Sequence, residues 1–280
     1  MMRGKPGTPI LRAMVFQLIM ILVTLVAVYP LLWLVLTSFK SKAAYIADQF
    51  GFPWPVFLGN FVVAFRGGRF ARWLLNSVIV TAGGTIGSTL LACLSGFAFA
   101  KMPFKGIRNL LNLVIALMVV PPVVMILPLF MMYTKLALHS TFHGIILLYV
   151  GLTLPFSVYL ITNFFKTIPN DLIEAGFMDG YSRIGILVNL IVPLSGAAIL
   201  TLIITNALWI WNELLIALTF LAKDNMRTLM VGITTFKTRY MLDVPVTMAG
   251  LLMTTIPMLL LYAVFQRSFI RGLTEGSLKG

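Results

Sequence analysis

The chain has 280 residues, of which 60% are hydrophobic and only 10% charged, and its formal net charge at pH 7 is +13. A soluble domain carries roughly 25% charged residues, so this composition excludes an ordinary globular protein and indicates a membrane protein. The positive charge does not indicate nucleic-acid binding, because no sustained Lys/Arg run with interleaved aromatic residues occurs and basic residues beside membrane spans anchor at headgroups.

Six apolar segments are long enough to cross a membrane, which takes about 20 residues in a helix. Each should be helical, because lipid offers backbone groups no hydrogen-bond partner. We predict an all-α membrane protein with an N-terminal arm at 1–12, a transmembrane domain at 13–266 and a C-terminal tail at 267–280. The predicted spans are 13–38, 74–100, 109–134, 144–165, 185–211 and 247–266.

The orientation follows from charge. Six spans put both termini on one side, and the Lys and Arg residues divide almost evenly between the two sides. Short basic segments close to span ends carry most weight, and these are the N-terminal arm and residues 101–108. We therefore expect both termini in the cytoplasm of a multi-pass cell-membrane protein.

The first two spans are joined by residues 41–73, where Phe52-Pro53-Trp54-Pro55 alternates proline with aromatics and cannot form a regular helix. We expect this segment to lie along the outer interface. The second span repeats small residues four apart, as in Gly83 and Gly87, so it should pack closely against other helices.

Polar and proline positions inside the spans are ambiguous. Pro121 and Pro122 interrupt the helical hydrogen bonds of the third span, and such a kink can line a solute pathway or serve packing alone. Asn206 in the fifth span must face protein or water, so it could line a pathway or form a bond between helices.

Catalytic and metal sites find no support in the sequence. The glycine-rich run beginning at Gly83 has no lysine, so the chain does not bind ATP through a phosphate loop. Cys93 is the only cysteine. His139 and His143 are four residues apart, but no acid or cysteine beside them completes a metal site. We expect no catalytic residue, no metal and no cofactor in this chain.

The most informative segment is a polar island between the fourth and fifth spans, which contains three of the eight acids, Asp171, Glu174 and Asp179. We predict a short helix over 171–179 that stops at Gly180, followed by a second helix with Ser182 as its cap. Ala175 and Gly176 would leave a bare face for a partner protein; an ordinary amphipathic loop is the alternative.

This segment resembles the EAA loop of ABC importer permeases of the binding-protein-dependent (type I) family. The motif stands here as Glu174-Ala175-Gly176, then Gly180, then Leu190-x-Val192-Pro193. Gly176 stands where the motif usually has alanine, and glycine is less favourable than alanine in a helix by up to about 1 kcal/mol. Trp211-Asn212-Glu213-Leu214-Leu215 and the tail 266–280 are similar to the carbohydrate subgroup, which includes the smaller permease subunit of maltose systems.

The resemblance implies a six-helix type I permease fold with a cytoplasmic coupling helix. It implies as partners a second homologous permease, a dimer of ATP-binding subunits that bind ATP and Mg, an extracytoplasmic solute-binding protein and membrane lipid. Glu174, Ala175, Gly176, Asp179 and Gly180 become coupling residues. The outer loop 220–246 would contact the binding protein or be a plain solvated connector; its candidate contact residues are Gly232, Lys237 and Arg239.

Two other functions compete with an ATP-driven importer of sugars, oligosaccharides or glycerol phosphates. An ion-coupled secondary transporter usually needs an ionisable group inside a span. Every acid here lies in a loop, a tail or at a span end, and Glu213 is the only one near the membrane. The other alternative is a membrane scaffold subunit without a pathway.

Overall fold

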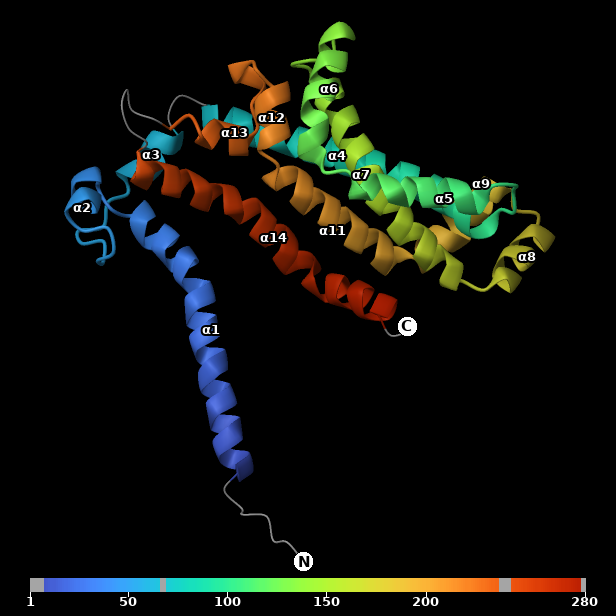
Figure 1. Cartoon of the computed structure of the whole chain (residues 1–280), viewed down its shortest axis with the longest axis horizontal. Helices are drawn as coiled ribbons and strands as arrows, with labels where there is room; N and C mark the ends of the chain where they lie inside the picture. Colours follow the sequence, from blue (N-terminus) through green and yellow to red (C-terminus); the bar gives the residue numbers. More distant parts are fainter. Residues whose placement is uncertain (1–7, 66–68, 237–242, 278–280) are drawn as a thin grey trace, which may run out of the picture. The chain divides into compact units, whose positions relative to one another are not determined.

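The computed structural model describes residues 8–65, 69–236 and 243–277, and side chains in 12–65, 69–236 and 243–266 (Figure 1). The described residues form helices and no strand. By their contacts the residues divide into two compact units, one made of 1–66 and 236–253 and the other of 67–235 and 254–280.

The first unit carries the apolar helix α1, a candidate span over Arg12–Ser38 in which residues 12–36 are not buried within the chain and only Thr37 and Ser38 at its end are. The C-terminal end of α1 is fastened to two short helices, and the unit also holds the start of the last helix. These helices are α1 (Thr8–Ser38), α2 (Lys42–Ala47), α3 (Gly59–Phe65) and α14 (Val244–Ser277).

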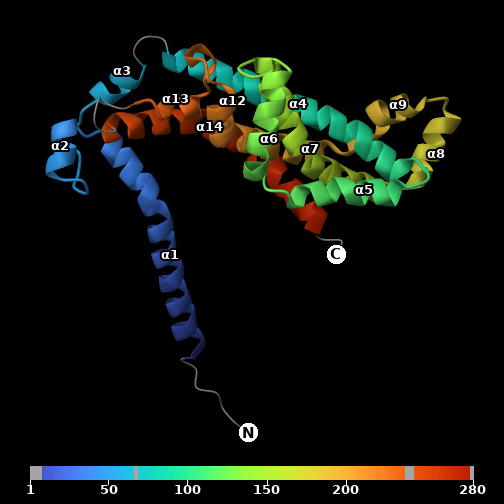
Figure 2. The same ribbon diagram turned by 45° about the horizontal axis from the view of Figure 1, so that its top comes forward.

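The second unit is built around three long helices, α4, α7 and α11, with shorter helices at both ends (Figure 2). Its elements are α4 (Arg69–Lys101), α5 (Ile107–Ala116), η2 (Leu117–Val119), α6 (Pro122–Lys135), α7 (Phe142–Thr167), α8 (Asn170–Met178), α9 (Arg183–Ile186), the π-helical turn η3 (Leu187–Ile191), α10 (Val192–Leu194), α11 (Gly196–Asn212), α12 (Leu215–Phe220), η4 (Asp224–Met226) and α13 (Leu229–Ile233).

Glycines let α4 and α7 lie side by side at close range. A Cβ atom on Gly83, Gly87 or Gly96 would come within 2.7–2.8 Å of a side-chain carbon of α7. At Gly96 it would also meet the backbone nitrogen of Thr162 at 3.3 Å. The prediction that this span packs closely through small residues is therefore confirmed.

Four of the six predicted spans are unbroken helices, and two are not. The third span consists of Ile107–Val119 and Pro122–Lys135, which meet at 99°. Val120 and Pro121 are extended, as expected for residues that precede proline, so the break is a sharp turn rather than the predicted kink.

The predicted fifth span 185–211 is also wrong as a single helix. Arg183–Leu194 and Gly196–Asn212 meet at 82°. Pro193 has no N–H and its ring clashes with the carbonyl four residues earlier, which accounts for the π-helical turn at 187–191 just before it. The long helix begins only at Gly196, and residues 183–194 form a separate arm after α8.

Asn206 joins the three long helices. Its side chain is 2% exposed, and Nδ2 donates to Ser88 Oγ of α4 at 3.1 Å and to Ser157 Oγ of α7 at 2.9 Å. An amide enclosed in this way does not line a surface of the chain. Of the two readings, the interhelix bond is therefore correct, and the prediction that Asn206 lines a pathway is wrong.

Replacing Asn206 with alanine should lower the free energy of unfolding by about 1–2 kcal/mol, because both hydroxyl groups lose their shared donor. Thermal unfolding in detergent measures the loss. The matched control is Asn212→Ala on the same helix, whose amide is exposed and bonds only the Leu208 carbonyl. Equal effects of the two substitutions would contradict the role given to Asn206.

Candidate functional site

The helix α8 lies where the polar island was predicted, at Asn170–Met178 instead of 171–179. Asp171 stands in its first turn, where a carboxylate is favoured by the helix dipole. The helix ends at Gly180, whose φ is +85°. The Tyr181 N–H donates to the Gly176 carbonyl and the Gly180 N–H to the Phe177 carbonyl, each at 3.0 Å, so the predicted stop at Gly180 is confirmed.

The next helix, α9, starts as predicted at Ser182. The Ser182 hydroxyl accepts a hydrogen bond from the Gly185 N–H at 3.1 Å, which satisfies one free donor of the first turn. The left-handed conformation of Gly180 ends α8, and the Ser182 side chain caps α9, so the turn between the two helices is fixed at both ends.

The inner face of α8 carries Ile173 and Gly176, both buried. A Cβ atom on Gly176 would lie 2.8 Å from Leu190 Cδ1 and 3.2 Å from Ile186 Cγ1. The expectation that Gly176 offers a bare face to a partner is therefore wrong, because this glycine faces the chain's own arm 183–194. Its neighbour Ala175 is exposed, as expected.

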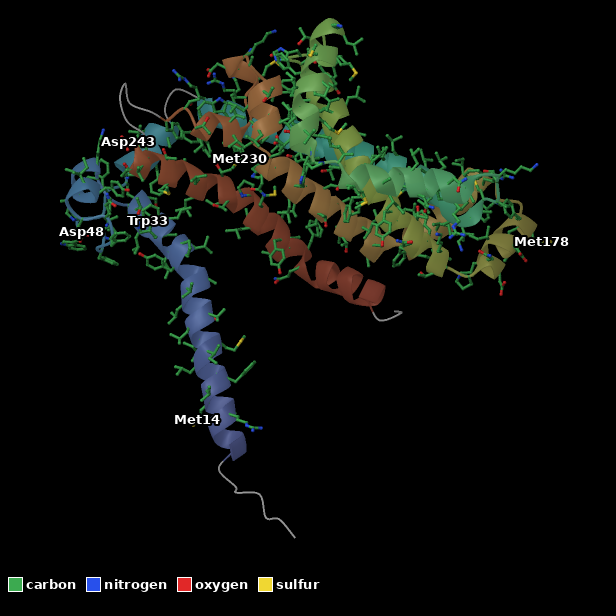
Figure 3. All side chains as sticks on the ribbon, viewed as in Figure 1. Met14, Trp33, Asp48, Met178, Met230 and Asp243 are labelled. Atoms are coloured by element: carbon green, nitrogen blue, oxygen red, sulfur yellow. The ribbon has the colours of Figure 1, made fainter. Side chains whose placement is uncertain are left out.

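The outer face of α8 combines acids with apolar side chains. Glu174 and Asp179 are exposed together with Leu172 and Phe177, and Met178 is 89% exposed at the tip of the helix (Figure 3). We call this set, Leu172, Glu174, Phe177, Met178 and Asp179, the α8 docking surface. An apolar anchor bordered by carboxylates suits a partner protein with an apolar cleft and basic side chains.

The inner face of α8 belongs to a buried apolar cluster that joins it to the long helices. Phe97 of α4, Phe165 of α7, Ile173 of α8, Ile186 of α9 and Leu202 of α11 are all members. Five helices that share one core cannot shift independently without opening cavities. Movement of α8 would therefore be passed to the three long helices.

Lys101, the last residue of α4, closes the polar side of this junction. Its Nζ donates to the Ile168 carbonyl at 2.5 Å and to Asn170 Oδ1 at 2.9 Å. Ile168 follows the end of α7, and Asn170 begins α8. One side chain therefore holds the end of α4, the end of α7 and the start of α8 together, which the sequence pattern alone did not indicate.

At the other end of the long helices, Glu213 performs a structural task that sequence reasoning missed. Its carboxylate accepts from Tyr149 OH at 2.7 Å and from the backbone N–H groups of Ile216 and Ala217 at 2.8 and 2.9 Å. The signal was available, since an acid just before a helix commonly caps it, and Glu213 precedes α12.

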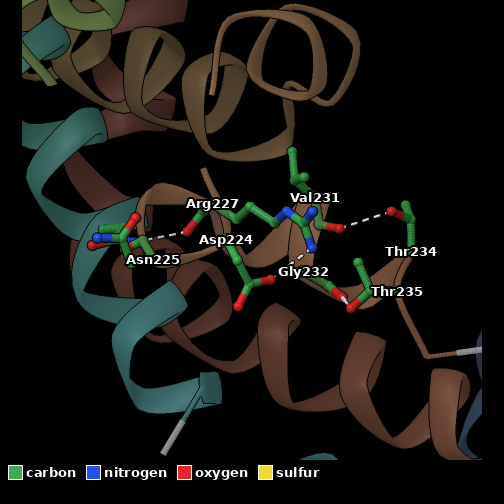
Figure 4. Close-up of polar contacts among 8 residues, drawn as sticks. Asp224, Asn225, Arg227, Val231, Gly232, Thr234 and Thr235 are labelled. Atoms are coloured by element: carbon green, nitrogen blue, oxygen red, sulfur yellow. Dashed lines mark hydrogen bonds and ion pairs between the residues drawn. The ribbon is translucent and has the colours of Figure 1, made fainter. Parts of the chain in front are cut away.

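The predicted contact loop 220–246 is largely folded. It contains η4, stabilised by the Asp224–Arg227 ion pair at 2.7 Å, and α13, whose end is held by threonine hydroxyls (Figure 4). Gly232 is buried, and a Cβ on it would lie 2.2 Å from the ring of Trp73. Gly232 is therefore a packing residue, and the prediction that it belongs to a contact surface is wrong. The other two candidate contact residues, Lys237 and Arg239, lie outside the described residues.

Asn76 and Ser77 of α4 bind the backbone of this loop through their side chains. Asn76 Nδ2 donates to the backbone carbonyls of Asn225 and Arg227 at 3.0 and 2.9 Å, and Ser77 Oγ accepts from the Leu229 N–H at 2.8 Å. The start of α4 therefore fixes the outer loop while its end fixes α8.

The bend at Pro121 and Pro122 borders an apolar groove of about 410 Å³ between α6 and α7. Its lining includes Pro122, Met125, Met132 and Pro155. That the two prolines line a solute pathway stays a prediction.

The two glycines of α8 should respond differently to alanine. Gly180→Ala should cost about 1 kcal/mol of unfolding free energy, because alanine disfavours positive φ. Gly176→Ala should cost less, because the end of the Leu190 side chain and Ile186 Cγ1 need to give way only slightly, while alanine stabilises a helix by up to about 1 kcal/mol relative to glycine. Thermal unfolding of both variants measures the two losses, and a larger loss for Gly176→Ala than for Gly180→Ala would contradict this prediction.

Lys101→Met should loosen the start of α8. A hydrogen bond to a charged donor contributes about 1.5–3 kcal/mol, so amide hydrogen exchange over residues 168–173 should accelerate by about tenfold or more. Lys101→Arg keeps a charged donor and should largely restore protection. The control is Lys105→Met, an exposed lysine nearby, and similar acceleration in that variant would remove Lys101 from this role.

Comparison with known proteins agrees with this arrangement. The chain is 34% identical to a putative ABC transporter permease protein, ORF2, of Caldicellulosiruptor sp. over 92% of this chain and 94% of the relative. It is 33% identical to the sulfoquinovosyl glycerol transport system permease protein SmoH of Agrobacterium fabrum over 90% and 89%. It is 29% identical to the trehalose/maltose transport system permease protein MalG of Thermococcus litoralis over 93% and 94%.

The fold is similar to that of a chain in the crystal structure of a bacterial ABC transporter involved in the import of the acidic polysaccharide alginate. The TM-score is 0.84 at 21% sequence identity, with 96% of this chain and 100% of the other covered. Residues 88–271 match the family model for the binding-protein-dependent transport system inner membrane component. This range contains α8, its apolar cluster and Lys101, and the chain belongs to that family of ABC importer permeases.

Proposed function

We propose that this chain is the membrane-spanning permease subunit through which an ATP-driven importer moves a sugar or sugar-like solute. The relatives named for sulfoquinovosyl glycerol and for trehalose/maltose support a carbohydrate solute. The permease role follows from the family, and in this role the chain itself catalyses no reaction.

The observation that carries the proposal is the α8 docking surface. A short helix that exposes Met178 and Phe177 beside Glu174 and Asp179 is unsuited to a free existence in water, yet its inner face is firmly packed. This combination suits a rigid element that enters a partner's cleft and passes force to the spans.

The partners that fit are a second homologous permease, two ATP-binding subunits and an extracytoplasmic binding protein. ATP and Mg would be held by the ATP-binding subunits. Because α8 would meet them in the cytoplasm, both chain termini would lie on that side, with α12 and α13 outside. The proposed coupling residues remain Glu174, Ala175, Asp179 and Gly180, with Gly176 acting through its packing on Leu190.

Ion-coupled transport gains no support from Glu213. A coupling carboxylate must exchange its ion during the cycle, but both oxygens of Glu213 accept hydrogen bonds that hold α12 and Tyr149. Releasing this carboxylate would leave two backbone donors without their acceptor. Glu213, the one acid near the membrane, therefore acts as a helix cap and not as an ion-binding group.

Met178→Lys should detach the ATP-binding subunits and thereby abolish transport. A buried unpaired charge at a docked anchor costs several kcal/mol, and each 1.4 kcal/mol is a tenfold loss of affinity. Co-purification of the ATP-binding subunits and transport in proteoliposomes should both fall by at least about tenfold. Met178→Leu, which keeps the apolar volume, should behave like the parent. Normal transport by Met178→Lys would exclude α8 as the coupling element.

The outer loop offers a second test. If Lys237 and Arg239 contact the binding protein, reversing both to glutamate should reduce stimulation of ATP hydrolysis by the binding protein, and adding salt should weaken the parent's response. Basal hydrolysis should persist. Lys223→Glu is the control on the same loop. Unchanged stimulation in the double variant would make residues 237–239 a simple connector.

A further inference from the structure

We propose that residues 48–58 form an aromatic anchor that inserts into the outer leaflet of the lipid bilayer beside the end of α1. Its members are Phe50, Phe52, Trp54, Val56 and Phe57. Phe50, Phe52 and Trp54 are 70%, 75% and 80% exposed, which is unusual for side chains of this size in a loop.

The loop has a fixed position relative to the membrane-spanning helix. The indole Nε1 of Trp33 donates to the Gln49 carbonyl at 3.3 Å. Trp33 lies five residues before the end of α1 at Ser38, which is roughly 7.5 Å along the axis at 1.5 Å per residue. Side chains lean toward the helix N-terminus, so Trp33 holds the loop beside α1, on the side of its end that faces the middle of the helix. Trp33 and Asp48 are labelled in Figure 3.

Buried polar contacts hold the loop in this position. Lys40 Nζ donates to the Asp48 carbonyl at 2.8 Å, and the Phe57 N–H donates to the Phe39 carbonyl at 2.9 Å. Asn60 Nδ2 donates to the carbonyls of Ser38 and Lys40 at 2.8 and 2.7 Å. Both ends of the loop are therefore tied to the end of α1.

The chemistry of the loop matches a lipid interface better than water or a soluble partner. Residues 49–65 contain no charged side chain. The carboxylate of Asp48 is engaged by the loop's own Gly51 and Phe50 N–H groups, and these hydrogen bonds hold the Asp48 pKa below its usual value. Tryptophan and phenylalanine favour the headgroup boundary.

Continuity with α1 identifies lipid as the occupant. The candidate span Arg12–Ser38 is long and apolar enough to cross a membrane, and none of its residues 12–36 is buried within the chain. The chain belongs to a family of inner membrane components, so lipid is the solvent available to this helix. The loop's exposed aromatics extend the apolar surface of this helix around its outer end. The apolar stretch of α1 is longer than a bilayer needs, so the helix could shift along the membrane normal. Aromatic side chains inserted at its end would fix its depth in the bilayer.

Spin-label accessibility tests the anchor in the full-length chain in lipid nanodiscs. Single cysteines are introduced as Phe52→Cys and Trp54→Cys in a Cys93→Ser background, which removes the only native cysteine. Val26→Cys in the middle of α1 is the lipid control, and Met178→Cys on α8 is the water control. Oxygen concentrates in lipid, and a water-soluble nickel complex stays in water. Labels at 52 and 54 should therefore collide with oxygen more often, and with the nickel complex less often, than the label at 178.

Two outcomes would overturn the proposal. If the labels at 52 and 54 are as accessible to the nickel complex as the label at 178, the loop lies in water. If they are poorly accessible to both reagents, the loop is buried against protein. If the labelled variants do not fold, quenching by brominated lipids decides the question: the parent should lose more tryptophan fluorescence than Trp54→Phe. Equal quenching in parent and variant would also reject the anchor.

Discussion

The close approach of α4 and α7 is the constraint on which the rest of the second unit depends. Gly83, Gly87 and Gly96 bring the two backbones near enough that a single added carbon at any of them would clash. In lipid, such packing replaces the hydrophobic effect as the force between helices. The shared polar node at Asn206 then adds α11 in a defined register, because only one alignment lets its amide reach both hydroxyls.

This three-helix core links α8 to the loop that contains α13. At one end, Asn76 and Ser77 of α4 hold the folded loop that contains α13. At the other, Lys101 of the same helix joins α7 to α8. A displacement of α8 would therefore reach the loop that contains α13 along a single continuous helix. The prolines at 121 and 193 break neighbouring spans but leave this helix intact.

Features encoded by local chemistry could be predicted from the sequence, and features that depend on tertiary contacts could not. The start, stop and cap of α8 and α9 follow from Asp171, Gly180 and Ser182, and the apolar segments follow from hydropathy. The direction faced by Gly176 could not be inferred, because a glycine suits both a partner interface and close packing on Leu190. Gly232 was misassigned for the same reason.

The sizes of the two bends were also beyond sequence reasoning. Proline predicts an interruption, but the angle depends on what the freed segment packs against. Residues 183–194 turn by 82° because their apolar side chains, such as Ile186 and Ile191, join the buried cluster beneath α8. The Glu213 cap was not predicted for a different reason: the short helix α12, whose first N–H groups it accepts from, was not itself expected.

The central claim is that α8 is the element through which cytoplasmic subunits act on the spans. The most direct measurement is site-specific cross-linking in the assembled transporter, with a short bifunctional thiol–amine reagent on Met178→Cys in a Cys93→Ser background. The account predicts a product that contains this chain and an ATP-binding subunit, and none from Val26→Cys in α1. No such product at position 178, in a transporter that still hydrolyses ATP, would contradict it.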